Sequence, residues 1–497
     1  MINKVIFSNE LAKNCSIVLG VYSDGTLSKS AQKINEYLGG AIERNLRKLN
    51  FTKKKLFDIC SFLSTGKDYN HVIIVDLGDP QKEFSKFELE KLGAAIYSGA
   101  KELDSDIAIA IDAADLHFTC DCASSFVGFG ALLKSWFFDK YKSRKDEKIK
   151  LKNLVMLTSD TKTSERCFEE LRKISDGIFL TRQVVSEPSN VIYPESLARI
   201  ALEELSPLGV EVEILNGDQM KHLGMNALLA VGQGSEHKPR LAILRWNGAD
   251  AEKPLVAFVG KGVTFDSGGI SLKPEENMHE MRYDMAGSGT VLGLLKAVAL
   301  NKLPVNVVGV MPMVENMPSG SAQRPGDIVK SMSGQTIEVL STDAEGRMVL
   351  ADALWYTQER FDPIVMIDLA TLTGAVVVAL GHEFAGMFSN CDELAEQIFK
   401  SSIATGEKVW RMPMSEHFDD GINSDLADVQ NIAKSHIRGG SITAAQFLRR
   451  FVNNKKWAHL DIAGVETSSN NLFICSAGAT GFGVHLLYDF LQKNYTS

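Results

Sequence analysis

Short apolar segments alternate with longer helical segments along the chain, and this alternation constrains the fold more than any other feature. Strand-sized apolar runs at 16–20, 71–75 and 107–111 flank helix-sized segments at 29–49 and 87–101. Alternation of this kind is typical of α/β folds, in which helices cover a mostly parallel sheet. We therefore expect α/β architecture from the first strand onward.

A chain of 497 residues is long enough for more than one domain. Residues 163–185 have a helical pattern that stops near Pro188, which cannot continue a helix. We expect an N-terminal α/β domain over 1–162, a linker helix over 163–186 and a larger catalytic domain over 187–497, with a central mixed sheet flanked by helices. The segments that predict the second domain are the strands 241–246, 255–259, 305–310, 336–340 and 364–369 and the helices 287–300 and 347–359.

The composition excludes several classes of protein. With 62 acidic and 53 basic residues, the net charge of −9 argues against non-specific binding to nucleic acid or anionic membranes. No segment is long and apolar enough to span a bilayer, and the first residues lack a secretory pattern, so we expect a cytoplasmic protein. The 7 cysteines are scattered without C-x-x-C spacing, which predicts buried thiols rather than disulfides.

Several common catalytic signatures are missing from the sequence. It contains no phosphate-binding loop, no G-x-S-x-G elbow and no G-x-G-x-x-G motif at the start of a helix. Two H-E pairs begin a zinc-binding H-E-x-x-H motif, but Tyr283 and Gly386 stand where the second histidine belongs. These absences disfavour hydride transfer, serine hydrolysis and zincin chemistry.

Charged residues gather where predicted strands end. The strand 255–259 runs into a glycine-rich segment, the segment 281–287 enters a helix, and the strand 336–340 runs into 341–347. Ligand sites in open α/β sheets lie at the carboxyl ends of the strands, so we expect these segments to converge. The charged residues that they bring are Lys261, Asp266, Lys273, Asp284, Asp343, Glu345 and Arg347.

Four carboxylates in one crevice repel one another unless cations neutralise them. Two divalent ions match four carboxylates, which favours a two-metal site with ions about 3.5–4 Å apart. Asp343 and Glu345 would reach the same site from an extended loop, where alternate side chains share a side. Taken singly, each residue also fits an ordinary role, such as Asp343 capping the helix that follows it.

The segments K-G-V-T-F-D-S-G-G, M-R-Y-D-M-A-G and T-D-A-E-G-R resemble the leucyl (cytosol) aminopeptidase family in content, order and spacing. The resemblance covers about residues 180–490 and includes 368–375, 457–464 and 478–483. One departure is Ser341, where the family usually has Asn. The resemblance implies the metal ligands Lys261, Asp266, Asp284, Asp343 and Glu345, the catalytic pair Lys273 and Arg347, and a substrate pocket formed by Met281, Thr371, Leu372 and Gly374.

The resemblance also implies an activity. Its members remove the N-terminal residue of a peptide, preferably Leu or another apolar residue, in intracellular peptide turnover. It implies two divalent ions per subunit, Mn²⁺ or Zn²⁺, a bicarbonate ion at Arg347 and a homohexamer. Lys261 would ligate a metal in its neutral form, and charged Lys273 would stabilise the oxyanion.

Two alternatives remain open at this stage. The same carboxylates would also suit a two-metal phosphoesterase. A DNA-binding or scaffolding role has weak support from basic residues of the first domain, which more often form a solvated helix face. Those residues are Arg44, Arg47, Lys48, Lys53, Lys54 and Lys55.

Overall fold

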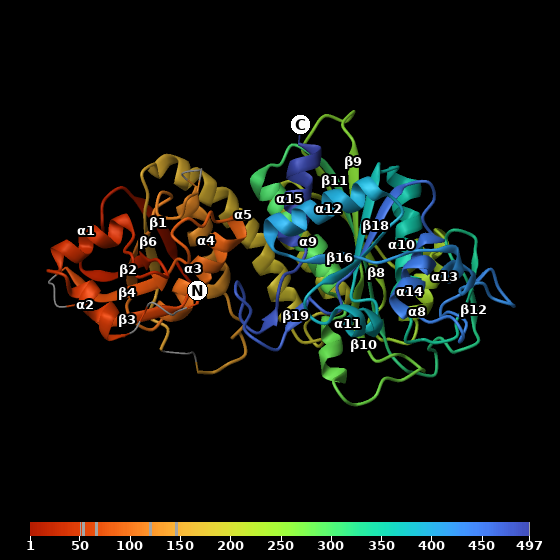
Figure 1. Ribbon diagram of the computed structural model, residues 1–497. Coiled ribbons are helices and arrows are strands. Elements are labelled where there is room, and N and C mark those ends of the chain that lie inside the picture. Colours follow the sequence, from red (N-terminus) through yellow and green to blue (C-terminus); the bar gives the residue numbers. More distant parts are fainter. Residues whose placement is uncertain (50, 52–54, 65–67, 119–121, 145–147, 497) are drawn as a thin grey trace. The chain divides into compact units, whose positions relative to one another are not determined.

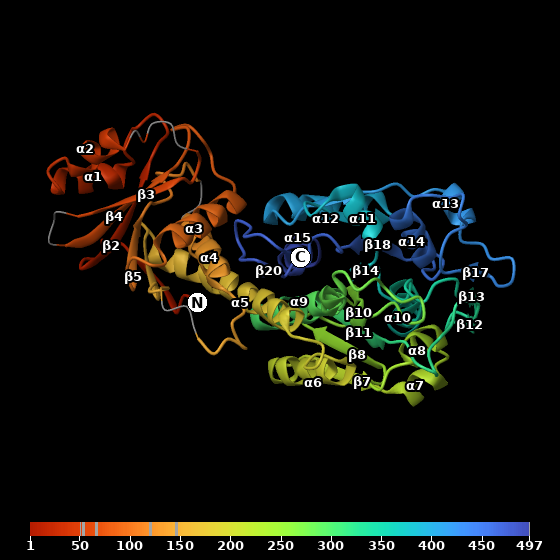
Figure 2. The same cartoon turned by 90° about the horizontal axis from the view of Figure 1, so that it is seen from below.

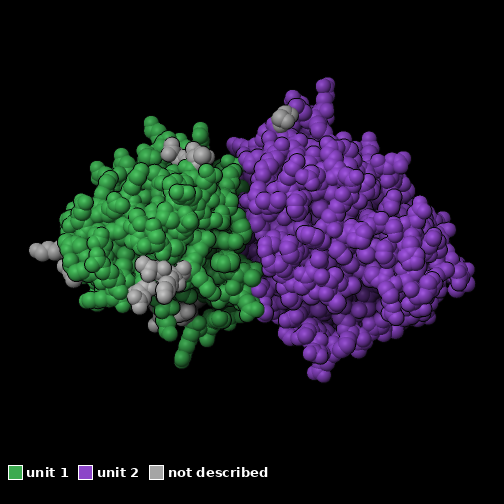
Figure 3. All heavy atoms as spheres, viewed as in Figure 1, with its two compact units in different colours: residues 1–175, 470–477 green, residues 176–469, 478–497 purple. Residues whose placement is uncertain are grey.

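The computed structural model describes residues 1–49, 51, 55–64, 68–118, 122–144 and 148–496. The chain divides into two compact units, residues 1–175 with 470–477 and residues 176–469 with 478–497 (Figures 1 and 3). The helix predicted over 163–186 is present as α5 (Thr161–Ser186). The division between the two units falls inside this helix. No helix among the described residues has the length and apolar character needed to cross a membrane.

Unit 1 is built on a six-stranded sheet in the order β1-β6-β5-β2-β4-β3, in which only β3 runs antiparallel to its neighbour. The predicted strands at 16–20, 71–75 and 107–111 correspond to β2, β4 and β5. The strands are β1 (Lys4–Ser8), β2 (Cys15–Val21), β3 (Ile59–Leu63), β4 (Tyr69–Asp76), β5 (Asp106–Ala110) and β6 (Asn153–Leu157). The helices are α1 (Lys29–Tyr37), α2 (Ala41–Lys48), α3 (Lys86–Ala100) and α4 (Ala123–Ser135).

The single helix predicted over 29–49 is wrong, because the structure has two helices there, α1 and α2. Gly39 and Gly40 adopt φ values of 60° and 80°, a left-handed conformation that ends the first helix. The Asn35 side chain then accepts hydrogen bonds from the backbone of Ile42 and Glu43 at the start of α2.

Three of the six basic residues that supported a nucleic-acid role lie on the solvent side of α2. Arg44, Arg47 and Lys48 are exposed, while Ile42 and Leu46 of the same helix are buried. This is the arrangement of an ordinary amphipathic surface helix. Lys53 and Lys54 lie outside the described residues.

The prediction that the cysteines form no disulfide is wrong for one pair. Cys122 precedes α4, Cys167 lies in α5, and the two form a disulfide with a Cα–Cα distance of 6.1 Å. They are 45 residues apart. Spacing along the chain could not reveal the pair, because the packing of two helices brings the thiols together.

Unit 2 is built on a nine-stranded mixed sheet in the order β16-β15-β18-β14-β9-β11-β8-β7, with β10 paired to β11. Two smaller sheets contain β12-β13-β17 and β19-β20. The strands are β7 (Glu211–Leu215), β8 (Arg240–Asn247), β9 (Leu255–Gly260), β10 (Gly262–Asp266), β11 (Asn306–Asn316), β12 (Ile328–Lys330), β13 (Thr336–Glu338), β14 (Val365–Ala370), β15 (Ala385–Ser389), β16 (Val409–Arg411), β17 (Val429–Gln430), β18 (Lys456–Asp461), β19 (Thr467–Ser468) and β20 (Gly478–Ala479). The helices are α6 (Pro194–Leu205), η2 (Ser206–Leu208), α7 (Gly217–His222), α8 (Asn226–Gly232), η3 (Met278–Tyr283), α9 (Ala286–Asn301), α10 (Gly346–Phe361), α11 (Gly374–Leu380), α12 (Asp392–Thr405), α13 (Glu416–Asp420), α14 (Gly440–Arg449) and α15 (Val484–Tyr495).

The central strands of unit 2 are buried on both faces. Val308 and Val310 of β11 lie in one hydrophobic cluster with the apolar residues of α10. The intervening Gly309 faces Val291 and Leu295 of α9. Side chains alternate along a strand, so α9 and α10 cover opposite faces of the sheet. In Figure 2, α6 and α15 lie with α9, whereas α8 and α14 lie with α10.

We predict that Asp352→Leu lowers the free energy of unfolding of unit 2 by about 2–4 kcal/mol. The buried Asp352 carboxylate of α10 accepts hydrogen bonds from the backbone N–H of Leu228 at 2.9 Å and of Met332 at 2.8 Å. Leucine would fill a similar volume but leave both buried donors without a partner. Denaturant unfolding followed by circular dichroism measures the change.

A matched control for this prediction is Asp362→Asn, at the exposed end of the same helix. Asp362 pairs with Lys455, and its side chain is 87% exposed, so its replacement should change the stability by less than about 1 kcal/mol. Equal effects of the two substitutions would contradict the structural role of Asp352.

Candidate functional site

The first part of the site follows the central strand β9. Lys261 comes directly after β9, and Asp266 ends β10, which pairs with β11. Asp284 lies between η3 and the start of α9. Since β9, β10, β11 and β14 run parallel, Lys261 and Asp266 lie at the carboxyl ends of the strands, where the sequence predicted a site, and Asp284 is paired with Lys261 there.

The third segment reaches the site by a different route from the one expected. β13 belongs to the separate three-stranded sheet and not to the central sheet. The loop after it is also not extended, because Ala344 N donates to Ser341 O in a turn and Glu345 is already helical at the cap of α10. Asp343 and Glu345 therefore converge through a turn and the start of a helix.

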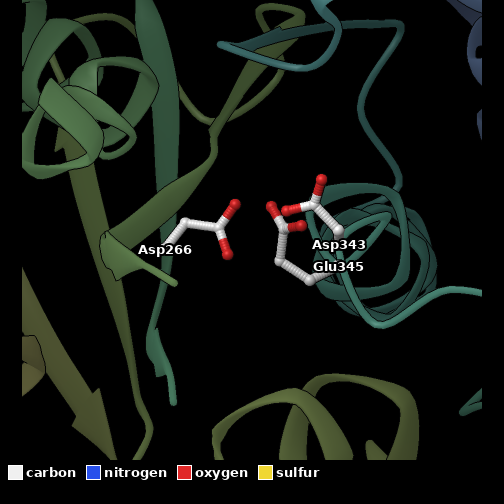
Figure 4. Close-up of side chains that lie close together, drawn as sticks. All are labelled: Asp266, Asp343 and Glu345. Carbon is white, nitrogen blue, oxygen red and sulfur yellow. The ribbon is translucent and has the colours of Figure 1, made fainter. Parts of the chain in front are cut away.

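Three carboxylates form one compact cluster. Asp266, Asp343 and Glu345 each offer an oxygen atom, and these atoms lie within 4.8 Å of one another. Figure 4 shows Asp343 and Glu345 side by side, with their carboxylates directed toward Asp266. Asp284 is not part of this group but connects to it through a shared lysine. The arrangement is one that could hold a metal ion.

Two lysines bridge the four carboxylates. Lys261 Nζ lies 2.8 Å from Asp284 Oδ1 and 2.8 Å from Glu345 Oε1, and both carboxylates are buried. Lys273 Nζ lies 2.8 Å from Asp266 Oδ2 and 2.5 Å from Asp343 Oδ1. Each lysine therefore neutralises part of two carboxylates.

A glycine makes room for the inner lysine. A Cβ atom at Gly346 would lie 2.7 Å from Lys261 Nζ and 2.7 Å from its Cε. A side chain at residue 346 would therefore displace the end of the Lys261 side chain from its present position between Asp284 and Glu345.

The crowding of charge shifts the pKa of several groups. Burial and the nearby Glu345 raise the pKa of Asp266 to about 6, and burial also raises the pKa of Asp284 and Asp343. Burial by itself would lower the pKa of both lysine ammonium groups, but the surrounding carboxylates outweigh it and raise each pKa. Without other cations, the site holds both lysines in the charged form.

Arg347 lies beside the cluster in the first turn of α10. Its guanidinium is buried and donates a hydrogen bond to Asn431 O at 2.8 Å, while its Nε has no hydrogen-bond partner among the described residues. Burial lowers the pKa of Arg347 to about 10, so the group stays charged at neutral pH. An anion that reaches this guanidinium would meet a fixed positive charge with a free donor.

The predicted pocket residues lie around the same centre. The Thr371 hydroxyl donates to Asp284 Oδ1 at 2.6 Å, and its carbonyl accepts a hydrogen bond from Lys261 Nζ at 2.8 Å. Leu372 packs partly against the core, and Gly374 begins α11 with open space around its Cα. Met281 precedes Asp284 in η3, and its carbonyl accepts the Asp284 N–H at 3.4 Å.

Sequence reasoning missed the residues that orient these groups. Asn316 Nδ2 donates to Asp266 Oδ1 at 2.8 Å and to Thr342 O at 3.0 Å, which ties two of the segments together. Asn431 supports the third segment through Leu340 N and Ser341 O, at 2.8 and 2.6 Å. Both asparagines lie outside the charged motifs, and the strand predicted over 305–310 stops before Asn316, which ends β11.

Asp461 is a further supporting residue. It ends β18, inside one of the segments on which the family resemblance rests, but its role could not be read from the sequence. Its carboxylate accepts hydrogen bonds from Leu372 N at 3.0 Å and Thr373 Oγ1 at 2.7 Å. It therefore fixes the loop between β14 and α11. Ser341, the departure from the family pattern, still contributes to its loop, because its hydroxyl accepts a hydrogen bond from Asp343 N.

The donor set fits divalent ions. Four carboxylates face two lysines, and the buried Asp284 Oδ2 has no hydrogen-bond partner among the described residues. Carboxylate oxygens this close together favour the binding of divalent cations over neutralisation by protein side chains alone. Fold and site together define a two-domain α/β protein with a centre suited to metal ions.

The chain belongs to the cytosol aminopeptidase family. The model of that family's catalytic domain matches residues 179–488, and the model of its N-terminal domain matches residues 18–145. Probable cytosol aminopeptidases are among the relatives, one from Ehrlichia ruminantium (strain Gardel) at 46% identity over 98% of this chain and 97% of the relative. Another, from Wolbachia pipientis wMel, is 50% identical over 87% of this chain and 86% of the relative. The chain is accordingly a peptidase with aminopeptidase function.

Solved structures of related enzymes have the same fold. A mutant tomato leucine aminopeptidase is 30% identical, with a TM-score of 0.86 over 99% of this chain and 97% of that one. The bottromycin maturation enzyme BotP, solved in complex with Mn, is 29% identical, with a TM-score of 0.83 over 97% of this chain and 99% of that one. These similarities confirm the predicted two-domain α/β fold.

We predict that the affinity of the protein for Mn²⁺ increases with pH, and more steeply below pH 6 than above it. Lys261 can bind a metal only after losing its proton. This requirement lowers the affinity for Mn²⁺ about tenfold for each unit by which the pH falls, throughout the neutral range. Asp266, with a pKa of about 6, must also lose a proton below that pH. Because the pKa of Asp266 is raised, its protonated form, which ligates poorly, already dominates below about pH 6.

Isothermal titration of the metal-free protein with Mn²⁺ at pH 5.5, 6.5 and 7.5 measures this dependence. Titrations in buffers of different ionisation enthalpy should also show net release of protons on binding. An affinity that does not change across this range would contradict the metal-ligand roles that the family resemblance implies for Lys261 and Asp266.

Proposed function

We propose that this aminopeptidase uses two divalent ions, Mn²⁺ or Zn²⁺, to remove N-terminal Leu and other apolar residues from peptides in the cytoplasm. The observation that carries the proposal is the convergence of Asp266, Asp343 and Glu345 within 4.8 Å, bridged by Lys261 and Lys273. The relation to a leucine aminopeptidase and to an enzyme solved with Mn supports it.

The residues that would hold the two ions are those of the cluster and its inner lysine. Bound there, the ions would polarise the scissile carbonyl and lower the pKa of a bound water. Lys261 would enter this ligand set as the neutral amine, so its proton leaves when the metals load. The ligands are Lys261, Asp266, Asp284, Asp343 and Glu345.

Lys273 would act on the reaction directly. Its side chain is 20% exposed, more than that of the buried Lys261, so its ammonium can turn from the carboxylates toward a substrate. As negative charge develops on the carbonyl oxygen, this ammonium would donate a hydrogen bond to it. Arg347 would hold a bicarbonate ion that carries the proton, because its own guanidinium stays charged and cannot act as a base.

The loop after β14 would position the substrate. Thr371 connects to Asp284 and Lys261, and the loop then continues into α11 at Gly374. The absence of a side chain at Gly374 leaves space beside the loop. We propose that Met281, Thr371, Leu372 and Gly374 receive the first side chain of the peptide.

We predict that Lys273→Ala lowers kcat about 10²–10³-fold on leucine p-nitroanilide and leaves Mn²⁺ content unchanged. Asp343→Ala and Glu345→Ala should lose both metal and cleavage, because each removes a carboxylate from the cluster. Metal content by elemental analysis and steady-state kinetics measure the two effects. The control is Lys400→Ala on the exposed face of α12, which should keep full activity.

The rival phosphoesterase is tested with the same preparations. With Mn²⁺ added, the protein should cleave leucine p-nitroanilide and not p-nitrophenyl phosphate. Phosphate release without amide cleavage, or full peptidase activity in Glu345→Ala, would refute the proposed function.

We also propose that the chain assembles as a homohexamer, which the family resemblance implies. Light scattering on the purified protein should give six times the mass of one chain, and a monomer mass would refute this part of the proposal.

A further inference from the structure

A carboxyl group that the proposed chemistry does not use lies just beyond β18. Residues 462–466 form a turn in which Glu466 N donates to Ile462 O at 3.1 Å. Glu466 O accepts a hydrogen bond from Thr480 N at 2.9 Å, and the next residue, Thr467, pairs with Ala479 in the small sheet. The backbone of Glu466 is therefore fixed on both sides.

The Glu466 side chain is not satisfied by the protein. Its Oε2 is enclosed and has no hydrogen-bond partner among the described residues, and its Oε1 accepts a long hydrogen bond of 3.4 Å from Thr467 Oγ1. Burial, together with the charges of Asp284 and Asp461, raises the pKa of Glu466 to about 8. An enclosed acceptor without a donor is costly, so the position suits a donor brought by a ligand.

The neighbours of Glu466 place it next to the substrate loop. Asp284 and Asp461, the two carboxylates that act on it, both bind that loop, through Thr371 Oγ1 and Leu372 N respectively. The turn also packs on the far end of α11, where a Cβ at Gly464 would lie 2.4 Å from Gly381 O. Glu466 thus stands between the metal centre and the helix that borders the proposed pocket.

The donor that fits this position is the end of a substrate side chain. The α-amine of a peptide is expected at the metal centre, so it is not free to reach a second carboxyl group. Leu372 would contact the carbon chain of the substrate's first side chain. The Glu466 carboxyl would then contact a cationic group at the end of that side chain. With a pKa of about 8, Glu466 is mostly neutral in the empty site at neutral pH, and an ammonium group brought against it would favour the charged carboxylate.

We propose that Glu466 is a specificity-determining residue that admits N-terminal residues with a cationic end, above all Lys, beside the apolar residues. This inference rests on the proposed aminopeptidase function and deepens it by naming a second substrate class. Norleucine has the carbon stem of Lys without the ammonium, so the two substrates isolate the contribution of the charge.

The test compares kcat/KM for the 7-amido-4-methylcoumarin derivatives of Lys, norleucine and Leu with the Mn²⁺-loaded enzyme. In Glu466→Met, the ratio of Lys to norleucine should fall about tenfold or more, while norleucine and Leu stay within about threefold of the wild type. Glu466→Gln, which keeps the shape but cannot ionise beside a bound ammonium, should lower the same ratio in the same direction.

Glu407→Gln is the matched control, because Glu407 is also a carboxyl raised in pKa by burial, to about 7, but accepts a hydrogen bond from Leu486 N at the start of α15. It should leave the ratio unchanged, and thermal unfolding verifies that each variant is folded. An unchanged ratio in Glu466→Met, or an equal loss on all three substrates, would overturn the inference. If the loaded wild type cleaves none of the three, the proposed function itself fails.

Discussion

The structure of the site depends on one electrostatic constraint, the gathering of four carboxylates in a small volume, of which Asp266, Asp284 and Glu345 are buried and Asp343 is exposed. No fold can place so much negative charge away from water unless cations accompany it. In this chain the cations are two lysine ammonium groups, each shared between two carboxylates. The neighbouring asparagines and loops bring these charges together. The neighbouring glycines keep other side chains out of the space that the charged groups occupy.

The fold supplies the geometry through its central strands. Strands β9, β11 and β14 lie side by side and parallel, and they are covered on both faces by helices. Their carboxyl ends therefore form a rigid base. Asn316 at the end of β11 fixes the loop after β13 to this base, and Asp461 at the end of β18 fixes the loop after β14. Asn431, which follows β17 of the small sheet, holds the loop after β13 from another side.

Much of this could be predicted from the sequence, and the reasons for the failures are physical. Alternating apolar segments predicted the α/β fold, and charged residues after strands predicted the segments that converge. The route of 341–345 into the site was wrong, because a three-residue strand in a small sheet looks the same in sequence as one in the central sheet. Asn316 and Asn431 could not be found, since their partners are backbone atoms and a carboxylate far away in the chain.

Thr371 couples the position of the loop after β14 to two charged groups of the site. Its hydroxyl and carbonyl contact Asp284 and Lys261, and the residues after it lead directly into α11. A shift of this loop therefore changes the surroundings of both charged groups at once. By reciprocity, any molecule whose binding depends on the position of the loop must alter the affinity for cations by the same factor by which the cations alter its own.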